Sequence, residues 1–151
     1  MEGVSLAIHA EPLVTETVSA LVSDLDPTLY YHSPAHTKDV LRQTLELAES
    51  DALDNRDVLL LAIAAAFHDA GFLKQRPKNE PIGAQMAIDA MAKTGRFSQE
   101  ECDLVEQMIL DTQLVMDGPA QISNSRLSPW LLDADLANLG RDDFWDQTML
   151  L

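Results

Sequence analysis

Three separate places in the chain carry side chains that can bind a metal ion. They are His36, the adjacent pair His68 and Asp69, and Asp135. Imidazole nitrogens and carboxylate oxygens together suit Mn²⁺, Fe²⁺, Co²⁺, Ni²⁺ or Mg²⁺, with positions left open to water and substrate. The set contains no thiolate, which disfavours a structural zinc site. We therefore expect one divalent metal ion that activates a water molecule for hydrolysis.

Two of these places are tied to apolar faces of predicted helices. His36 lies one turn before Val40, so the core-facing side of its helix begins with an imidazole. His68 and Asp69 end the most apolar run of the chain, residues 58–67. Because burial of an unpaired carboxylate is costly, Asp69 needs a cation or several hydrogen-bond donors there. A metal ion would meet that need; the alternative is a set of structural, hydrogen-bonded polar residues.

Asp135 belongs to a third apolar helix. Leu132, Leu136 and Leu139 mark the buried face of that helix, and Asp135 lies beside the stripe. Asp133, two residues away, is turned from Asp135 by about 200°. We therefore expect Asp135 to bind the metal, and Asp133 to face solvent or to support a ligand without binding the metal itself.

Helix signals recur along the chain, and strand alternation does not. Asp54 and the capping box of Ser98 and Glu101 mark two helix starts, and Gly71 marks a helix end. The apolar stripes of the first two helices include Val22 and Leu47 as inward-facing residues. The expected helices cover about 12–24, 34–50, 55–70, 79–94, 99–114, 128–139 and 142–151. The fold class is all-α, a compact bundle of about six to seven helices in a single domain, 1–151.

The composition limits the partners. The chain has 10 lysines and arginines against 25 aspartates and glutamates, a net charge of −15. This argues against duplex nucleic acid or an anionic membrane as the partner, because both are gripped by basic side chains. A small phosphorylated substrate remains compatible, because a bound metal ion can reverse the local charge of a site.

Targeting signals are missing from the sequence. The first 14 residues have no basic segment followed by an apolar one, and the longest apolar run, Val58 to Phe67, is 10 residues, too short to span a bilayer. The single cysteine, Cys102, cannot form an intramolecular disulfide. We expect a cytoplasmic protein. The apolar end, residues 144–151, predicts either a chain that continues beyond residue 151 or a docking surface, for example in a homodimer.

The candidate metal-binding residues lie in three short motifs. In order and composition these motifs resemble those of the HD superfamily of metal-dependent phosphohydrolases. The nearest resemblance is to small bacterial proteins predicted to be HD phosphohydrolases, and it covers residues 29–144. The motifs comprise Tyr31, His32, His36 and Thr37; then Phe67, His68, Asp69, Gly71 and Phe72; then Asp133, Asp135, Leu139 and Gly140.

The resemblance implies an all-α HD domain that uses a divalent metal ion to hydrolyse phosphomonoesters or phosphodiesters. It also implies that His36, His68, Asp69 and Asp135 are the metal ligands. Members with two metals carry further histidines after the His-Asp pair, but Asn79 stands where relatives often have histidine. One metal is therefore expected. Glu80 stands where this branch usually has an acid, and it can serve as a base or position water.

The expected reaction is hydrolysis of a phosphoester in a small molecule, with a nucleotide as the first candidate. Asp69 or Glu80 would orient the water, and His32 would protonate the departing oxygen. His32 precedes its helix, so periodicity does not fix its direction; it can equally bind a second metal or a backbone group. Three basic residues close to the His-Asp pair can hold a substrate phosphate or simply face solvent: Lys74, Arg76 and Lys78.

Two other functions compete with hydrolysis. One is a regulatory or scaffold HD module that keeps its metal but turns over little substrate. The other is a di-iron oxygenase, which requires extra histidine and aspartate ligands that the sequence does not offer. Metal stoichiometry and turnover distinguish the three.

Overall fold

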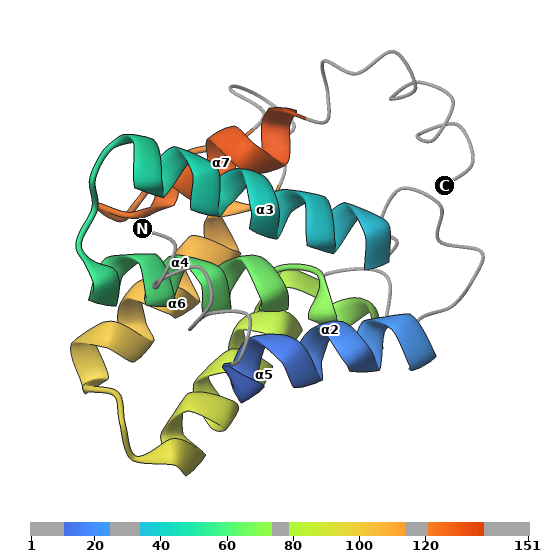
Figure 1. The fold of residues 1–151 in the computed structure, drawn as a ribbon. Helices are drawn as coiled ribbons and strands as arrows, with labels where there is room; N and C mark the ends of the chain where they lie inside the picture. Colours follow the sequence, from blue (N-terminus) through green and yellow to red (C-terminus); the bar gives the residue numbers. More distant parts are fainter. Residues whose placement is uncertain (1–10, 25–33, 74–78, 114–120, 138–151) are drawn as a thin grey trace.

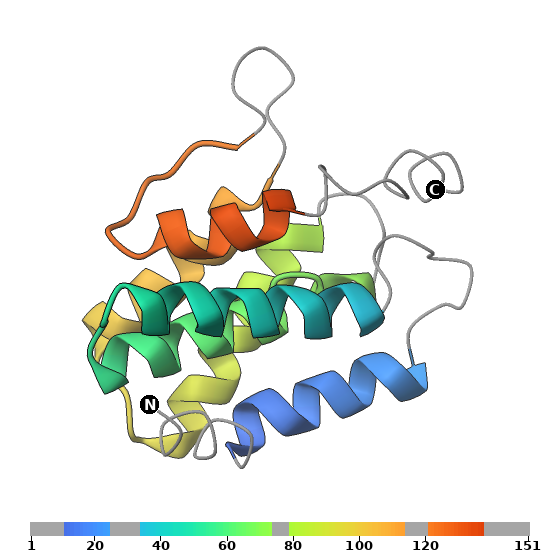
Figure 2. The same cartoon turned by 45° about the horizontal axis from the view of Figure 1, so that its top comes forward.

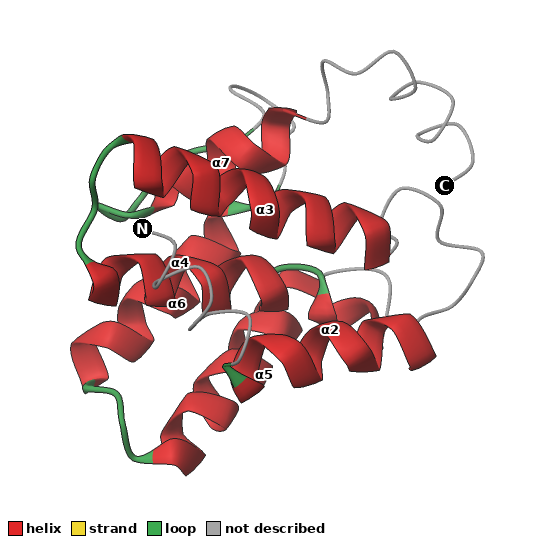
Figure 3. Ribbon diagram, viewed as in Figure 1, coloured by secondary structure: helices red, strands yellow, loops and turns green. Residues whose placement is uncertain are grey.

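The fold is known from a computed structural model that describes residues 11–24, 34–73, 79–113 and 121–137. Within these ranges the chain forms helices and loops and no strand, as Figure 3 shows. The all-α prediction is confirmed. The elements, in order, are α2 (Pro12–Asp24), α3 (Pro34–Ser50), α4 (Asn55–Phe67), the 3-10 turn η1 (Ala70–Leu73), α5 (Asn79–Thr94), α6 (Gln99–Asp111) and α7 (Ser128–Leu136).

Helix α4 is the centre of the bundle and contacts each of the other five α-helices. All its residues from Leu60 to Phe67 are buried, because the segment has no polar face to turn toward water. Helices α3 and α7 lie side by side over one side of α4, and α5 and α6 lie on the other (Figures 1 and 2). The burial that holds these layers together stabilises the fold by about 1.5–3 kcal/mol for each fully buried large apolar side chain.

Local capping sets the helix starts where the sequence predicts them. Asp54 caps α4, and its side chain accepts a hydrogen bond from the backbone N–H of Asp57 at 2.8 Å. Ser98 and Glu101 form the predicted capping box of α6. Gly95 ends α5 with a φ of +67°, in the left-handed region that favours glycine.

Some expected boundaries are wrong. Helix α4 stops at Phe67 instead of running to residue 70, and His68 and Asp69 form a turn before η1. Helix α6 ends at Asp111 instead of residue 114, with Thr112 as its C-cap. Helix α7 ends at Leu136, and the predicted helix over 142–151 lies outside the described residues.

Two predicted core residues are exposed. Val22 and Leu47 are 55% and 36% exposed, respectively. The adjacent residues Leu21 and Ala48 are fully buried, and each step along a helix turns the side chain by about 100°, so Val22 and Leu47 point away from the core.

Close approach of backbones explains Gly71 better than a helix end does. A Cβ atom at Gly71 would lie 1.9 Å from the carbonyl oxygen of Asn79. A Cβ atom at Gly83 would lie 2.8 Å from the carbonyl oxygen of Phe67. The first turns of α5 therefore pack directly against the segment that carries His68 and Asp69.

None of the helices in the described part of the chain has the length and apolar character needed to span a membrane.

Candidate metal centre

Three helix ends meet on one side of the bundle. The first turn of α3 carries His36, the end of α4 leads into His68 and Asp69, and the last turn of α7 carries Asp135. Figures 1 and 2 show that α3 runs antiparallel to α4 and α7, so its beginning lies at their ends. The topology thus brings together residues that are far apart in the sequence.

The ring nitrogens of the two histidines face the two carboxylates. Nε2 of His36 lies 3.4 Å from Nε2 of His68 and 3.6 Å from Oδ2 of Asp69. Nε2 of His68 lies 3.4 Å from the same Asp69 oxygen. Asp135 approaches from α7, with Oδ1 at 3.1 Å from Nε2 of His36 and 3.6 Å from Nε2 of His68.

These donor atoms can hold a metal ion. His36, His68 and Asp69 are all buried and each offers one ligand atom, with the three atoms within 4.8 Å of one another. Bond lengths of about 2.0–2.2 Å place neighbouring ligand atoms about 3.0 to 3.5 Å apart around a cation. The distances of 3.1 to 3.6 Å among the four side chains agree with that spacing.

The tautomer of His68 suits a ligand. Its Nδ1 lies 2.6 Å from the backbone carbonyl oxygen of Ala65, one turn earlier in α4. A carbonyl oxygen only accepts, so Nδ1 must carry a hydrogen and donate it. In the neutral ring this leaves the lone pair on Nε2, which is the nitrogen that faces the cluster. Such a backbone partner is the usual support of a metal-binding histidine.

The electrostatics of the cluster favour a positive charge inside it. Burial disfavours the charged imidazole of His68, but the carboxylates of Asp69 and Asp135 outweigh that penalty and raise the pKa of His68 to about 10. Burial likewise opposes ionisation of Asp135, but the imidazoles of His36 and His68 hold its pKa well below the usual range. The two carboxylates thus bind a proton tightly, and a cation can take its place.

Asp135 has a second partner that the sequence did not point to. Nε2 of Gln121 donates a hydrogen bond to Oδ2 of Asp135 at 2.9 Å and another to the backbone carbonyl of Thr112 at 2.8 Å. Gln121 lies in the segment before α7, where no periodicity marks a polar residue as inward-facing. No sequence signal would have identified it.

The other predicted site residues either lie outside the described residues or do not join the cluster. His32, Lys74, Arg76 and Lys78 lie outside the described residues. Glu80 is half-buried in the first turn of α5, and no hydrogen bond or ion pair joins it to the described residues of the cluster. Asp133 is exposed, as expected of a residue turned away from the cluster.

The described arginines are engaged elsewhere. Each forms an ion pair on the protein surface, and the acceptors are Asp39 and Glu46 for Arg42, Glu101 for Arg56, Glu11 for Arg96 and Asp57 for Arg126. A cavity of about 520 Å³ opens between α2 and α3, but none of the four cluster residues lines it. Neither feature supplies an anion site at the cluster.

Comparisons of the chain with protein-family models, with curated proteins and with solved structures found no match.

Proposed function

We propose that this chain is an HD-type, metal-dependent phosphohydrolase that cleaves a phosphoester bond in a small phosphorylated molecule, with a nucleotide as the first candidate substrate. The observation that carries the proposal is the convergence of four side chains from three helix ends, with Nε2 of both histidines facing carboxylate oxygens at 3.1 to 3.6 Å. Hydrolysis of a phosphoester is chemistry that such a mixed nitrogen and oxygen site supports.

In this proposal Asp135 joins His36, His68 and Asp69 as the fourth ligand. The metal would be Mn²⁺, Fe²⁺, Co²⁺, Ni²⁺ or Mg²⁺, because two carboxylates and two imidazoles without a thiolate suit these ions. When bound, the ion would lower the pKa of a coordinated water molecule and would polarise a phosphoryl oxygen. It would also offset the negative charge of the two carboxylates, which otherwise repel a phosphorylated substrate.

The remaining roles fall to the acids and bases of the chain. Asp69 and Glu80 are the carboxylates that can accept a proton from the attacking water. The backbone of Asn79 approaches Gly71 closely, so the first turn of α5, which includes Glu80, lies beside the His68–Asp69 segment. His32 is the proposed donor to the departing oxygen. Lys74, Arg76 and Lys78 are proposed to bind the substrate phosphate, because the described arginines are already paired.

The decisive experiment measures metal content and hydrolysis together. The purified full chain is stripped with a chelator, loaded with Mn²⁺, Co²⁺, Ni²⁺ or Mg²⁺, and assayed for phosphate release from a panel of nucleoside mono-, di- and triphosphates and from nitrophenyl mono- and diesters. His68→Ala and Asp69→Ala should abolish both metal binding and turnover. Asp133→Asn, an exposed neighbour of Asp135, is the matched control and should change neither.

Three outcomes would contradict the proposal. Turnover that survives removal of the metal or substitution of His68 would exclude this mechanism. One metal bound per chain without hydrolysis of any member of the panel would favour the regulatory or scaffold function. If the wild-type chain binds no metal, the cluster is a structural set of hydrogen-bonded polar residues.

A further inference from the structure

Gln121 connects the metal cluster to the end of α6. Its side-chain nitrogen donates to Oδ2 of Asp135 at 2.9 Å and to the backbone carbonyl of Thr112 at 2.8 Å. A backbone carbonyl cannot donate, so the nitrogen of the amide, and not its oxygen, must face Thr112. The orientation of the amide is therefore fixed by chemistry.

This contact divides the carboxylate of Asp135 between two partners. Oδ2 accepts from Gln121, and Oδ1 lies 3.1 Å from Nε2 of His36. A carboxylate held by a single contact can rotate, whereas one held at both oxygens has one orientation. Gln121 thus turns Oδ1 of Asp135 toward the two histidines.

The segment that carries Gln121 is itself anchored to α6. The carboxylate of Asp111 is buried, and it accepts hydrogen bonds from the backbone N–H and the side-chain amide of Asn124 at 2.7 and 2.8 Å, and from Oγ of Ser128 at 2.7 Å. Asp111 and Thr112 are consecutive residues. The end of α6 therefore holds both the segment before α7 and the amide of Gln121.

The oxygen of the same amide points to a ligand. Oε1 of Gln121 is buried and has no hydrogen-bond partner among the described residues. An unpaired buried acceptor is costly, and in proteins such atoms are usually satisfied by an ordered water molecule or a bound group. A donor bound beside Asp135 would satisfy it.

We propose that Gln121 is a positioning residue of the metal centre, which orients Asp135 for metal binding through its side-chain amide. This inference rests on the proposed function, because it assumes that Asp135 is a ligand. Partners that orient metal ligands in this way typically contribute 10–100-fold to metal affinity.

The test uses Co²⁺ as the probe and the full chain in three forms: wild type, Gln121→Met and Gln113→Met. Methionine keeps the length of glutamine but cannot donate to Asp135 or Thr112. Gln113 is exposed and makes no side-chain contact with the cluster, so its substitution is the matched control. Each metal-free protein is titrated with Co²⁺ while its visible absorption is recorded, and circular dichroism checks its helix content.

We expect Gln121→Met to bind Co²⁺ about 10–100-fold more weakly than wild type, with an altered visible spectrum, and Gln113→Met to match wild type. A purely structural role would lower the melting temperature but leave Co²⁺ affinity and spectrum unchanged, and that result would overturn the inference while leaving the metal centre intact. A wild-type chain that binds no Co²⁺ would overturn the proposed function as well.

A second measurement serves if Gln121→Met does not fold. In wild-type protein labelled with ¹⁵N, the side-chain N–H signals of Gln121 should exchange slowly with solvent and should shift when Zn²⁺, a diamagnetic probe, is added. Fast exchange together with unchanged shifts would show that the amide does not hold Asp135.

Discussion

Nε2 of His36 lies 3.1 Å from Oδ1 of Asp135, although 99 positions separate the two residues in the sequence. The contact joins the first turn of α3 to the last turn of α7, and these helices lie side by side (Figure 2). His68 and Asp69, which follow the end of the central helix α4, lie within 3.6 Å of this pair. The proposed metal centre therefore depends on the packing of α7 against α3, and not only on the chemistry of one local motif.

Asp135→Asn tests that dependence. Asparagine keeps the shape of the side chain but removes its charge, so the cluster should lose one anionic ligand while the packing of α7 is preserved. We expect Co²⁺ affinity to fall by at least the 10–100-fold that loss of a supporting partner costs. Thermal stabilisation by a fixed excess of metal should shrink in parallel, because that stabilisation depends on the ratio of metal concentration to Kd. Equal Co²⁺ affinity in Asp135→Asn and Asp133→Asn would show that Asp135 is not a ligand.

The sequence predicted those parts of the fold that local chemistry decides. The start of α4 at the Asp54 cap and the start of α6 at the Ser98 capping box need only neighbouring residues, and both are confirmed. The helix from Pro12 to Asp24 is also confirmed at both ends. Exposure of Val22 and Leu47 was not predictable in the same way, because it depends on which side of each helix the neighbouring helices cover, and the adjacent Leu21 and Ala48 are the residues that they bury.

The site was predictable as a set of residue types but not as a geometry. The apolar surroundings of His36, His68 and Asp69 predicted buried polar groups, and all three are buried. The end of α4 at Phe67 was missed because Gly71 is required by the close approach of Asn79, a contact between separate elements. Gln121 was missed because its inward position comes from the anchoring of its segment on Asp111, again a tertiary effect.

Gly71→Ala should damage both stability and metal binding. The new Cβ atom would lie 1.9 Å from the carbonyl oxygen of Asn79, so α5 or the His68–Asp69 segment must move. Overpacking of this kind costs typically about 1–3 kcal/mol. Urea unfolding of the metal-free protein measures the loss of stability, and Co²⁺ titration measures the accompanying displacement of Asp69.

Gly95→Ala is the control for that substitution. Its Cβ atom would meet nothing within 4 Å, but its φ of +67° makes the alanine unfavourable by about 1–2 kcal/mol. It should therefore lower stability without changing Co²⁺ affinity. Wild-type Co²⁺ affinity in Gly71→Ala would contradict the inferred coupling between α5 and the cluster.

Ser128→Ala should destabilise the anchor at the end of α6. Ser128 is fully buried, and its hydroxyl donates to Oδ2 of the buried Asp111 carboxylate at 2.7 Å. Alanine removes this donor and leaves a buried charge with fewer hydrogen bonds, at a cost of about 1.5–3 kcal/mol. Urea unfolding gives the value, with exposed Ser123→Ala as the control near zero. A loss of stability no larger than that of the control would show that the hydroxyl contributes nothing to the anchor.

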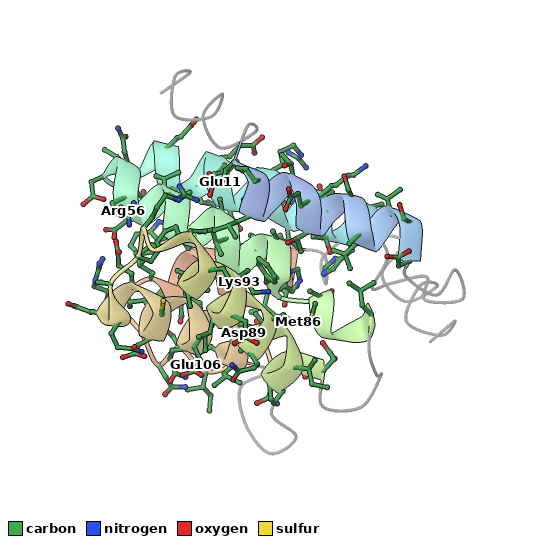
Figure 4. The ribbon with its side chains drawn as sticks, turned by 90° about the horizontal axis from the view of Figure 1, so that it is seen from below. Glu11, Arg56, Met86, Asp89, Lys93 and Glu106 are labelled. Carbon is green, nitrogen blue, oxygen red and sulfur yellow. The ribbon has the colours of Figure 1, made fainter. Side chains whose placement is uncertain are left out.

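Glu101→Gln should make the protein less sensitive to acid. The guanidinium of Arg56, at 2.5 Å from Oε2, and the backbone N–H of Ser98 lower the pKa of Glu101 to about 2. Arg56 lies on the surface seen in Figure 4 and also stacks over the ring of Phe97 at 4.7 Å, which holds the guanidinium in place.

The direction of the pH effect follows from that lowered pKa. The carboxylate stabilises the folded state above its ordinary pKa of 4.5, and this contribution is lost as the pH falls from 4.5 toward 2. The free energy of unfolding of wild type should therefore fall more steeply with decreasing pH than that of Glu101→Gln over this window. The difference between the two slopes should correspond to uptake of up to about one proton per molecule. It should be smaller in high salt, because the pair is partly exposed. Urea unfolding between pH 5 and pH 2.5 measures both slopes. Glu106→Gln, on the same helix and without an ion pair among the described residues, should keep the wild-type slope. Parallel slopes for wild type and Glu101→Gln would show that the Arg56 pair contributes no net stability to the fold.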